Sequence, residues 1–211
     1  MSFSTQASLV AANLACERGD LSIFSDIDFE LNAGEMLLIE GANGSGKTTL
    51  LRTLCGLSRL ASGHVTLGGE PLSELSYQDK KQILFIGHKD AVKEEFSPLE
   101  NLLFWQGLRG NKPDEAACLK ALYLAGLKGR ELLLARYLSQ GQKRRSALAR
   151  LLVNPPYLWV LDEPLAALDV AAASWLSGLI AKHLKAGGMV VATSHQPFDA
   201  VLTPKILQVG G

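Results

Sequence analysis

The chain has 211 residues, of which 47% are hydrophobic and 20% are charged, a composition typical of a folded globular protein. Its 21 Lys and Arg balance 21 Asp and Glu, so the formal net charge is zero and the composition does not favour nucleic acid as a partner. The length predicts that residues 1–211 form a single domain.

Several classes of protein are disfavoured by what the sequence lacks. No stretch approaches the ~18 to 20 apolar residues that a membrane-spanning helix requires. Residues 1–20 have neither the basic start nor the continuous apolar core of a signal peptide. The cysteines, Cys16, Cys55 and Cys118, are far apart and form no C-x-x-C pair, which favours reduced core thiols in a cytosolic protein. If the protein acts at a membrane, we expect another chain to span it.

Short apolar runs alternate with helix-like stretches, which is typical of an α/β protein with a largely parallel sheet. We expect strands over residues 8–14, 21–31, 36–40, 65–67, 83–86, 157–161, 189–193 and 205–209. We expect helices over residues 47–57, 139–152 and 170–185. The strands near the N-terminus are predicted to form a small antiparallel portion, and the last strand is predicted to lie at a sheet edge.

The pattern becomes helical from Ser97 to about residue 127. Ser97 has the properties of an N-cap, with Pro98 at the first helical position and Glu100 at the third. A second start signal, Pro-Asp-Glu, follows at residues 113–115. We therefore expect an inserted helical lobe over about residues 89–150.

The strongest motif is G-x-x-x-x-G-K-[ST], between an expected strand and an expected helix. The glycines of such a loop let backbone N–H groups turn toward phosphate oxygens, and the helix adds its partly positive N-terminus. Lys47 can reach the β- and γ-phosphates, and the Thr48 hydroxyl can bind Mg²⁺. The alternative is a glycine-rich turn that matches by chance. The motif predicts that ATP is bound by Gly41, Ala42, Asn43, Gly44, Ser45, Gly46, Lys47 and Thr48.

A second motif is an apolar run that ends in two acidic residues, Asp162 and Glu163. Placing charge at the end of a buried strand costs free energy, so acidic residues there indicate a function. We expect Asp162 to hold Mg²⁺ through the water shell of the metal, and Glu163 to polarise the attacking water as a general base. The alternative is that a carboxylate caps the following turn.

A third motif, L-S-Q-G-Q, occupies residues 138–142. Taken alone, Ser139 would be only a helix N-cap. Downstream of a phosphate loop, however, the Ser139 hydroxyl, with Gly141 and Gln142, is a second candidate phosphate site. One γ-phosphate does not easily satisfy both sites within one chain. We therefore expect a homodimer in which each ATP lies between the phosphate loop of one copy and Ser139 of the other.

This order of motifs resembles the ATP-binding cassette (ABC) ATPases over essentially the whole chain. The resemblance implies a P-loop NTPase fold of ABC type, with a mostly parallel sheet flanked by helices. It also implies that residues 167–169, Ala-Leu-Asp, form the D-loop. His195 would be the switch histidine, which contacts the γ-phosphate and steadies the water near Glu163.

Two positions depart from the pattern of that family. The loop after the strand I-L-F-I usually carries a Gln, and this chain has His88. A neutral imidazole can accept a hydrogen bond from water, so we expect His88 to be catalytic, the alternative being a contact with a partner or the backbone. An aromatic residue normally stacks on adenine near residues 14–19, where Arg18 could stack its guanidinium plane instead.

Within the family, the segments I-E-G-A-N-G-S-G-K-T-T-L-L-R, I-G-H, S-P-L-E-N-L-L-F-W and T-S-H-Q-P resemble the ATP-binding subunits of bacterial heme exporters used in cytochrome c maturation. The resemblance implies an ATP-hydrolysing translocase subunit, peripheral on the cytoplasmic face of the inner membrane. It would work as a homodimer with a separate integral-membrane permease, with ATP and Mg²⁺ as cofactors and without nucleic acid. Two alternatives are another small ABC exporter, for a lipid or lipoprotein, and a soluble ABC ATPase of iron–sulfur cluster assembly.

The permease is expected to dock beside His88 and the helical lobe. Phe96, Phe104 and Trp105 are candidates for that contact, and core packing is the alternative for at least two of them. The remaining histidines, His64 and His183, are expected to be solvated surface residues, and no heme ligand is assigned to this chain.

Overall fold

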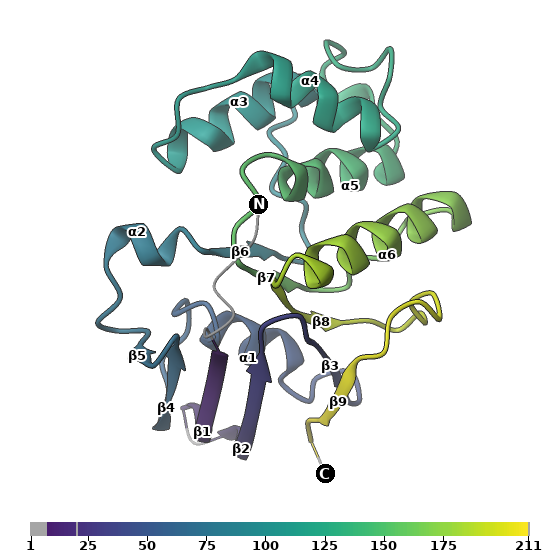
Figure 1. The fold of residues 1–211 in the computed structure, drawn as a ribbon. Helices are drawn as coiled ribbons and strands as arrows, with labels where there is room; N and C mark the ends of the chain where they lie inside the picture. Colours follow the sequence, from purple (N-terminus) through teal and green to yellow (C-terminus); the bar gives the residue numbers. More distant parts are fainter. Residues whose placement is uncertain (1–7, 20, 211) are drawn as a thin grey trace.

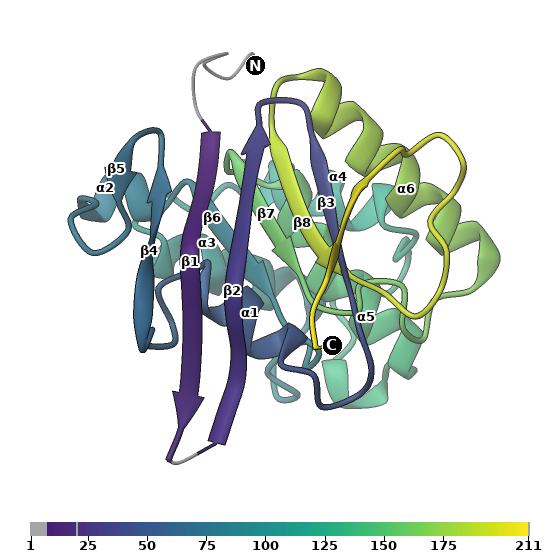
Figure 2. The same ribbon diagram turned by 90° about the horizontal axis from the view of Figure 1, so that it is seen from below.

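The computed structural model describes residues 8–19 and 21–210, which contain two β-sheets. The first sheet is antiparallel, with the order β2-β1-β4-β5. Its strands are β1 (Ser8–Arg18), β2 (Leu21–Asn32), β4 (Ser62–Leu67) and β5 (Glu70–Pro71). Figure 2 shows β1 and β2 as two long neighbouring strands. The predicted antiparallel portion near the N-terminus is therefore confirmed.

The second sheet has five strands in the order β6-β7-β8-β3-β9, and every neighbouring pair is parallel. The strands are β3 (Met36–Glu40), β6 (Ile83–Ile86), β7 (Leu158–Leu161), β8 (Met189–Thr193) and β9 (Lys205–Gln208). Every residue of β7 and β8 is buried, which explains why both read as continuous apolar runs. The last strand, β9, lies at a sheet edge, as predicted.

The helices are α1 (Lys47–Thr53), α2 (Tyr77–Lys80), α3 (Pro98–Leu108), α4 (Glu115–Leu124), α5 (Gln140–Leu148) and α6 (Val170–Lys185), with two 3₁₀ turns, η1 (Ala135–Tyr137) and η2 (Ala149–Leu152). In Figure 1, α3, α4 and α5 gather at the end of the molecule away from β1 and β2. Within the described part of the chain, none of the helices combines the length and apolar character needed to span a bilayer.

Side chains along each strand point alternately to the two faces of the parallel sheet, so hydrophobic core lies on both faces. Leu37 and Ile39 of β3 point into a cluster that α1 and the antiparallel sheet cover. Met36 points to the opposite face, into a cluster with α6. A third cluster joins α3, α4 and η2, and Trp105 packs against both the second and the third.

Helix ends follow their local signals. Ser97 caps α3 in a reciprocal capping box with Glu100, and Asp114 caps α4 by accepting from the Ala117 N–H at 2.9 Å. The predicted helix over residues 47–57 is too long, because the α-helix ends at Thr53 and the chain turns at Gly56, whose φ is 68°. The predicted helix over residues 139–152 divides into α5 and η2.

The prediction for His183 is wrong. His183 lies on the same face of α6 as Leu176 and Ile180, seven and three residues earlier, so it is only 6% exposed. Its ring stacks on Trp159 with centroids 3.7 Å apart, and Nε2 lies 3.1 Å from the carbonyl oxygen of Tyr157. Burial lowers the pKa of His183 to about 4, so the ring is neutral at physiological pH. His64 is exposed, as predicted.

Candidate functional site

The site lies where the carboxyl ends of the parallel strands meet. The phosphate loop follows β3 and leads into α1, and Asp162 and Thr193 stand at the ends of β7 and β8. Parallel strands that pair in register bring such ends to one edge of the sheet, where open α/β sheets bind their ligands. The loop that carries His88 starts at the same edge, because the Asp162 N–H donates to the carbonyl oxygen of Ile86 at 2.8 Å.

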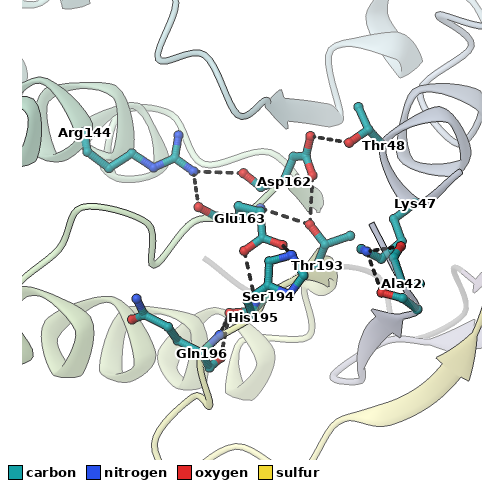
Figure 3. A network of polar contacts seen from close by, with 11 residues as sticks. Ala42, Lys47, Thr48, Arg144, Asp162, Glu163, Thr193, Ser194, His195 and Gln196 are labelled. Atoms are coloured by element: carbon teal, nitrogen blue, oxygen red, sulfur yellow. Dashed lines mark hydrogen bonds and ion pairs between the residues drawn. The ribbon is translucent and has the colours of Figure 1, made fainter. Parts of the chain in front are cut away.

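Two glycines of the phosphate loop are required by close packing. Gly41 has a φ of 154°, and a Cβ there would lie 2.2 Å from the carbonyl oxygen of Val209. Gly46 has a φ of 94°, and a Cβ there would lie 2.7 Å from Cγ2 of Ile23. Lys47 lies back over the loop, where its Nζ donates to the carbonyl oxygens of Gly41 at 2.6 Å and Ala42 at 2.9 Å (Figure 3). The backbone of the loop is thus tightly curved and forms a cradle, with the Lys47 ammonium at its opening.

The cradle fits a phosphate group. Oγ of Ser45 is buried and has no hydrogen-bond partner among the described residues, so its hydroxyl can donate to a ligand. Gly46, the N-cap of α1, supplies no side chain to the N–H groups of the first helical turn. These donors, with the Lys47 ammonium, are suited to the phosphate oxygens of ATP.

Thr48 and Asp162 meet across the site, although they are far apart in the sequence. The Thr48 hydroxyl donates to Oδ2 of Asp162 at 2.9 Å, and Oδ1 of Asp162 accepts from the Thr193 hydroxyl at 2.8 Å (Figure 3). A hydroxyl and a carboxylate are the oxygen ligands that Mg²⁺ prefers. No cluster of three or more His, Cys, Asp or Glu side chains that could hold a metal is present in the described residues. Water and phosphate oxygens would complete the coordination, as is usual for Mg²⁺.

Glu163 combines an unusual backbone conformation with a carboxylate that contacts His195. Its φ is 48°, and its N–H donates to the Thr193 hydroxyl at 3.0 Å. Oε2 accepts from the backbone N–H of His195 at 3.0 Å. Oε1 is buried and makes no hydrogen bond within the described part of the chain, while Nε2 of His195 lies 3.5 Å away. A buried carboxylate oxygen that receives no hydrogen bond can accept a proton from a water molecule, which is the chemistry of a general base.

The residues of the L-S-Q-G-Q motif lie at the start of α5. Ser139 is exposed and caps α5 in a reciprocal capping box with Gln142, in which Ser139 Oγ accepts from the Gln142 N–H at 3.3 Å. Gly141 faces the predicted D-loop, because a Cβ there would lie 2.7 Å from the carbonyl oxygen of Ala167. The exposed Ser139 end of α5 can therefore face another molecule. His88 is also exposed.

Sequence reasoning missed two residues of this site. Thr193 is fully buried and its hydroxyl joins Asp162 to the backbone of Glu163; the available signal was a polar residue at the end of the apolar run M-V-V-A-T. Arg144 is 2% exposed and donates to the carbonyl oxygens of Asp162 and Glu163 (Figure 3). Its spacing from the buried Ala147 and Leu148, three and four residues later, indicated the inner face of α5.

Comparison with known proteins places this geometry in a family. The ABC transporter family matches residues 24–166, more than half of the chain. The chain belongs to the ABC transporter family. Membership confirms the predicted family and activity class, an ATP-binding subunit that hydrolyses ATP in an ABC transporter.

The relatives of this ABC protein indicate its branch within the family. It is 47% identical to the cytochrome c biogenesis ATP-binding export protein CcmA of Dechloromonas aromatica, over 89% of this chain and 92% of that protein. It is 45% identical to the protein of the same name from Escherichia coli K12, over 90% of each chain. The predicted resemblance to ATP-binding subunits of cytochrome c maturation is therefore confirmed.

Solved structures support the fold. A Pyrococcus furiosus protein described as an ABC transporter ATP-binding protein superposes with a TM-score of 0.81 at 27% identity, over 95% of this chain and 97% of that chain. An ATP-binding cassette of an ABC transporter in its ADP conformation gives a TM-score of 0.75 at 23% identity, over 92% of this chain and 83% of that chain. The predicted fold class, an ABC-type P-loop α/β domain, is confirmed.

Proposed function

We propose that this ABC protein is the ATP-hydrolysing subunit of the heme exporter of c-type cytochrome biogenesis. It would act from the cytoplasmic face of the bacterial inner membrane, as a peripheral protein bound to a separate integral-membrane permease. The names of the relatives support the cytochrome c branch. The observation that carries the hydrolytic role is the buried Oε1 of Glu163, which makes no hydrogen bond within the described residues and lies beside the Thr48–Asp162 pair.

In the proposed mechanism, the phosphate loop binds the phosphates of ATP through residues 41–48. Lys47 exchanges its bonds to Gly41 and Ala42 for bonds to phosphate oxygens, and Ser45 donates its hydroxyl, which has no partner among the described residues. Thr48 and Asp162 would hold Mg²⁺, whose charge offsets that of the phosphates when it is bound. Oε1 of Glu163 accepts a proton from the attacking water, while Oε2 stays bound to the His195 N–H.

The second phosphate contact is proposed to come from another copy of the chain. Ser139, Gly141 and Gln142 lie at the exposed start of α5, where helix N–H groups and the Ser139 hydroxyl can receive a γ-phosphate. In a homodimer, each ATP would lie between the phosphate loop of one protomer and Ser139 of its partner. ATP binding would close the dimer, and hydrolysis would release it.

The permease is proposed to dock on the helical lobe, about residues 89–150, beside His88. Phe96 and Phe104 pack edge to face with their ring centroids 5.9 Å apart, and Nζ of Lys93 lies over both rings. Phe104 is 39% exposed, so this pair offers an apolar contact with a cation beside it. Trp105 instead packs into the core. A membrane partner that docks here would also contact the loop of His88.

The proposed export role can be tested by isolating the protein with its membrane partner. We expect the full chain, affinity-purified from solubilised inner membrane, to bring with it a multi-spanning permease encoded with the other cytochrome c maturation proteins. Heme is expected to stimulate ATP hydrolysis by that complex. Stimulation by a lipid or a lipoprotein instead would indicate another exporter, and recovery of iron–sulfur scaffold proteins without a permease would indicate cluster assembly.

A catalytic role of His88 makes a separate prediction. If His88 orders the attacking water, His88→Ala should lower kcat about tenfold with little change in the affinity for ATP, because the phosphate loop is untouched. His88→Gln should keep more activity, since an amide can also hydrogen-bond to water. The measurement is steady-state hydrolysis with equilibrium ATP binding, and His64→Ala, at another exposed histidine, is the control. Equal rates in all variants would leave His88 without a catalytic role.

A further inference from the structure

The guanidinium group of Arg144 is buried where α5 faces the end of β7. Its nitrogens donate, at 2.8 to 3.3 Å, to five oxygens: the carbonyl oxygens of Gly87, Asp162, Glu163 and Pro164, and Oδ1 of Asp90. Four of these acceptors belong to the main chain. Arg144 therefore fixes the course of two backbone segments, the one that contains Glu163 and the one that leads to His88.

The backbone of Glu163 depends on this support. Its φ of 48° lies in the left-handed region, which residues other than glycine rarely adopt. The N–H of Glu163 donates to Thr193 at 3.0 Å, and its carbonyl oxygen accepts from Nη2 of Arg144 at 2.8 Å. The peptide groups on both sides of the Glu163 Cα are thus held. A strained conformation at a reacting residue persists only where its surroundings fix it in this way.

Asp90 connects Arg144 to the L-S-Q-G-Q motif. Oδ1 of Asp90 accepts from Nη1 of Arg144 at 3.0 Å, and Oδ2 accepts from Nε2 of Gln140 at 3.1 Å. The side chains of Asp90 and Arg144 are only 8% and 3% exposed, so water screens their interaction little. Gln140 follows Ser139 directly. The Asp90 carboxylate therefore links two parts of the molecule. One is the Ser139 end of α5, which would face the ATP of the partner, and the other is Arg144, which holds Glu163.

The loop that carries His88 and Asp90 is also held at other points. Nη2 of Arg150, in η2, donates to the carbonyl oxygen of Ala91 at 2.6 Å. Asn101 of α3 accepts from the N–H of Lys93 at 2.8 Å and donates to its carbonyl oxygen at 3.0 Å. The loop is thus hydrogen-bonded to η2 and α3 as well as to α5, so a displacement of Gln140 or of α3 would reach Arg144 through Asp90.

We propose that Arg144 is a positioning residue that holds Glu163 for hydrolysis, and that Asp90 couples this positioning to the nucleotide at the Ser139 end of α5. The inference rests on the proposed function, because it takes Glu163 as the base and Ser139 as a contact to the ATP of the partner. In the dimer, the chain Ser139–Gln140–Asp90–Arg144–Glu163 leads from the nucleotide of one site to the base of the other. The two sites are therefore expected to hydrolyse ATP cooperatively.

The first test is Arg144→Lys, which keeps the positive charge but replaces a planar group with several donors by a single nitrogen. We expect kcat to fall about 10- to 100-fold, since a small displacement of a catalytic group has effects of this size. The dissociation constant for ATP should stay within about twofold, because Lys47 and Thr48 are unchanged. The readouts are steady-state hydrolysis and equilibrium ATP binding of the full chain in complex with its permease.

The second test is Asp90→Asn, which keeps the shape of the side chain and one acceptor oxygen but removes the charge. We expect the Hill coefficient for Mg-ATP, above one in the unsubstituted protein, to fall toward one, with a smaller loss of kcat than in Arg144→Lys. Glu94→Gln is the matched control, because Glu94 also joins this loop to α5, through Lys143 at 2.5 Å, but lies outside the Arg144 contacts. It should keep the unsubstituted kcat and Hill coefficient.

A double substitution separates positioning from general damage. In a Glu163→Gln background, Arg144→Lys should not lower the single-turnover rate further, because there is no base left to position. Additive losses, an unchanged kcat in Arg144→Lys, or a Hill coefficient of one in the unsubstituted protein would overturn the inference. If Arg144→Lys does not fold, the test rests on Asp90→Asn. A kcat and a Hill coefficient of Asp90→Asn equal to those of Glu94→Gln would then overturn the proposal. Failure of the proposed function, in which Glu163 is the base, is distinguishable, because Glu163→Gln alone would then keep the unsubstituted rate of Mg-ATP hydrolysis.

Discussion

Replacing Glu163 by Gln is expected to lower the rate of ATP hydrolysis by a factor of about 10² to 10⁴, the usual contribution of a positioned general base. The amide keeps the size of the side chain and its carbonyl oxygen can still accept the His195 N–H, but it accepts no proton from water. ATP should still bind, since the phosphate loop, Thr48 and Asp162 are unchanged. Hydrolysis and ATP binding measured on the same preparation test the prediction.

The same substitution is expected to trap the dimer. ATP that is not hydrolysed would remain between Lys47 of one protomer and Ser139 of its partner. Size-exclusion chromatography in Mg-ATP should then show an ATP-dependent dimer, and the dimer should be absent in ADP. A Glu163→Gln protein that binds ATP in complex with its permease but leaves the two Ser139 ends apart, as judged by crosslinking, would contradict the shared site.

Ser139→Arg, added to Glu163→Gln, provides the matched test of the second phosphate contact. It places bulk and positive charge at the exposed start of α5 and also removes the cap of that helix. Loss of a cap costs about 1 kcal/mol, which a protein of ordinary stability tolerates, so the fold should remain. The trapped dimer should disappear. A dimer that persists in the double variant would argue against Ser139 as a phosphate contact.

Local signals in the sequence accounted for most of the elements. The phosphate loop lies between β3 and α1 as predicted, because glycine spacing and the lysine are properties of eight consecutive residues. The caps at Ser97 and Asp114 also depend only on residues within one helical turn. The limits of α1 and α5 were harder to predict, because tight turns and 3₁₀ geometry at helix ends depend on what packs against them.

Long-range contacts account for what the sequence did not predict. Thr48 and Asp162 are separated by 114 residues, and their motifs predict a role for each but not that the two side chains touch. Arg144 is one of three consecutive basic residues, 143–145, and its acceptors come from segments 18 to 57 residues away along the chain. His183 was misjudged for the same reason, since only the packing of α6 on β7 brings its ring against Trp159.

Lys47→Ala is expected to abolish hydrolysis and to weaken ATP binding about 10- to 100-fold. The substitution removes a charge-assisted hydrogen bond to phosphate, worth about 1.5 to 3 kcal/mol. The backbone cradle should keep its shape, because it depends on Gly41 and Gly46, and Lys47 donates only to two carbonyl oxygens of the loop itself. The expected change in Tm is therefore small, within about 2 °C.

Lys128→Ala is the control for that experiment, because Lys128 is an exposed lysine that lies over the ring of Tyr123 and outside the phosphate loop. It should leave both hydrolysis and ATP affinity at the unsubstituted level. Titration with ATP, a hydrolysis assay and thermal denaturation of the two variants side by side separate loss of the charge from loss of the fold. Normal turnover in Lys47→Ala would remove this loop from the hydrolytic site, whereas a large fall in Tm would show that Lys47 stabilises the loop through its bonds to Gly41 and Ala42.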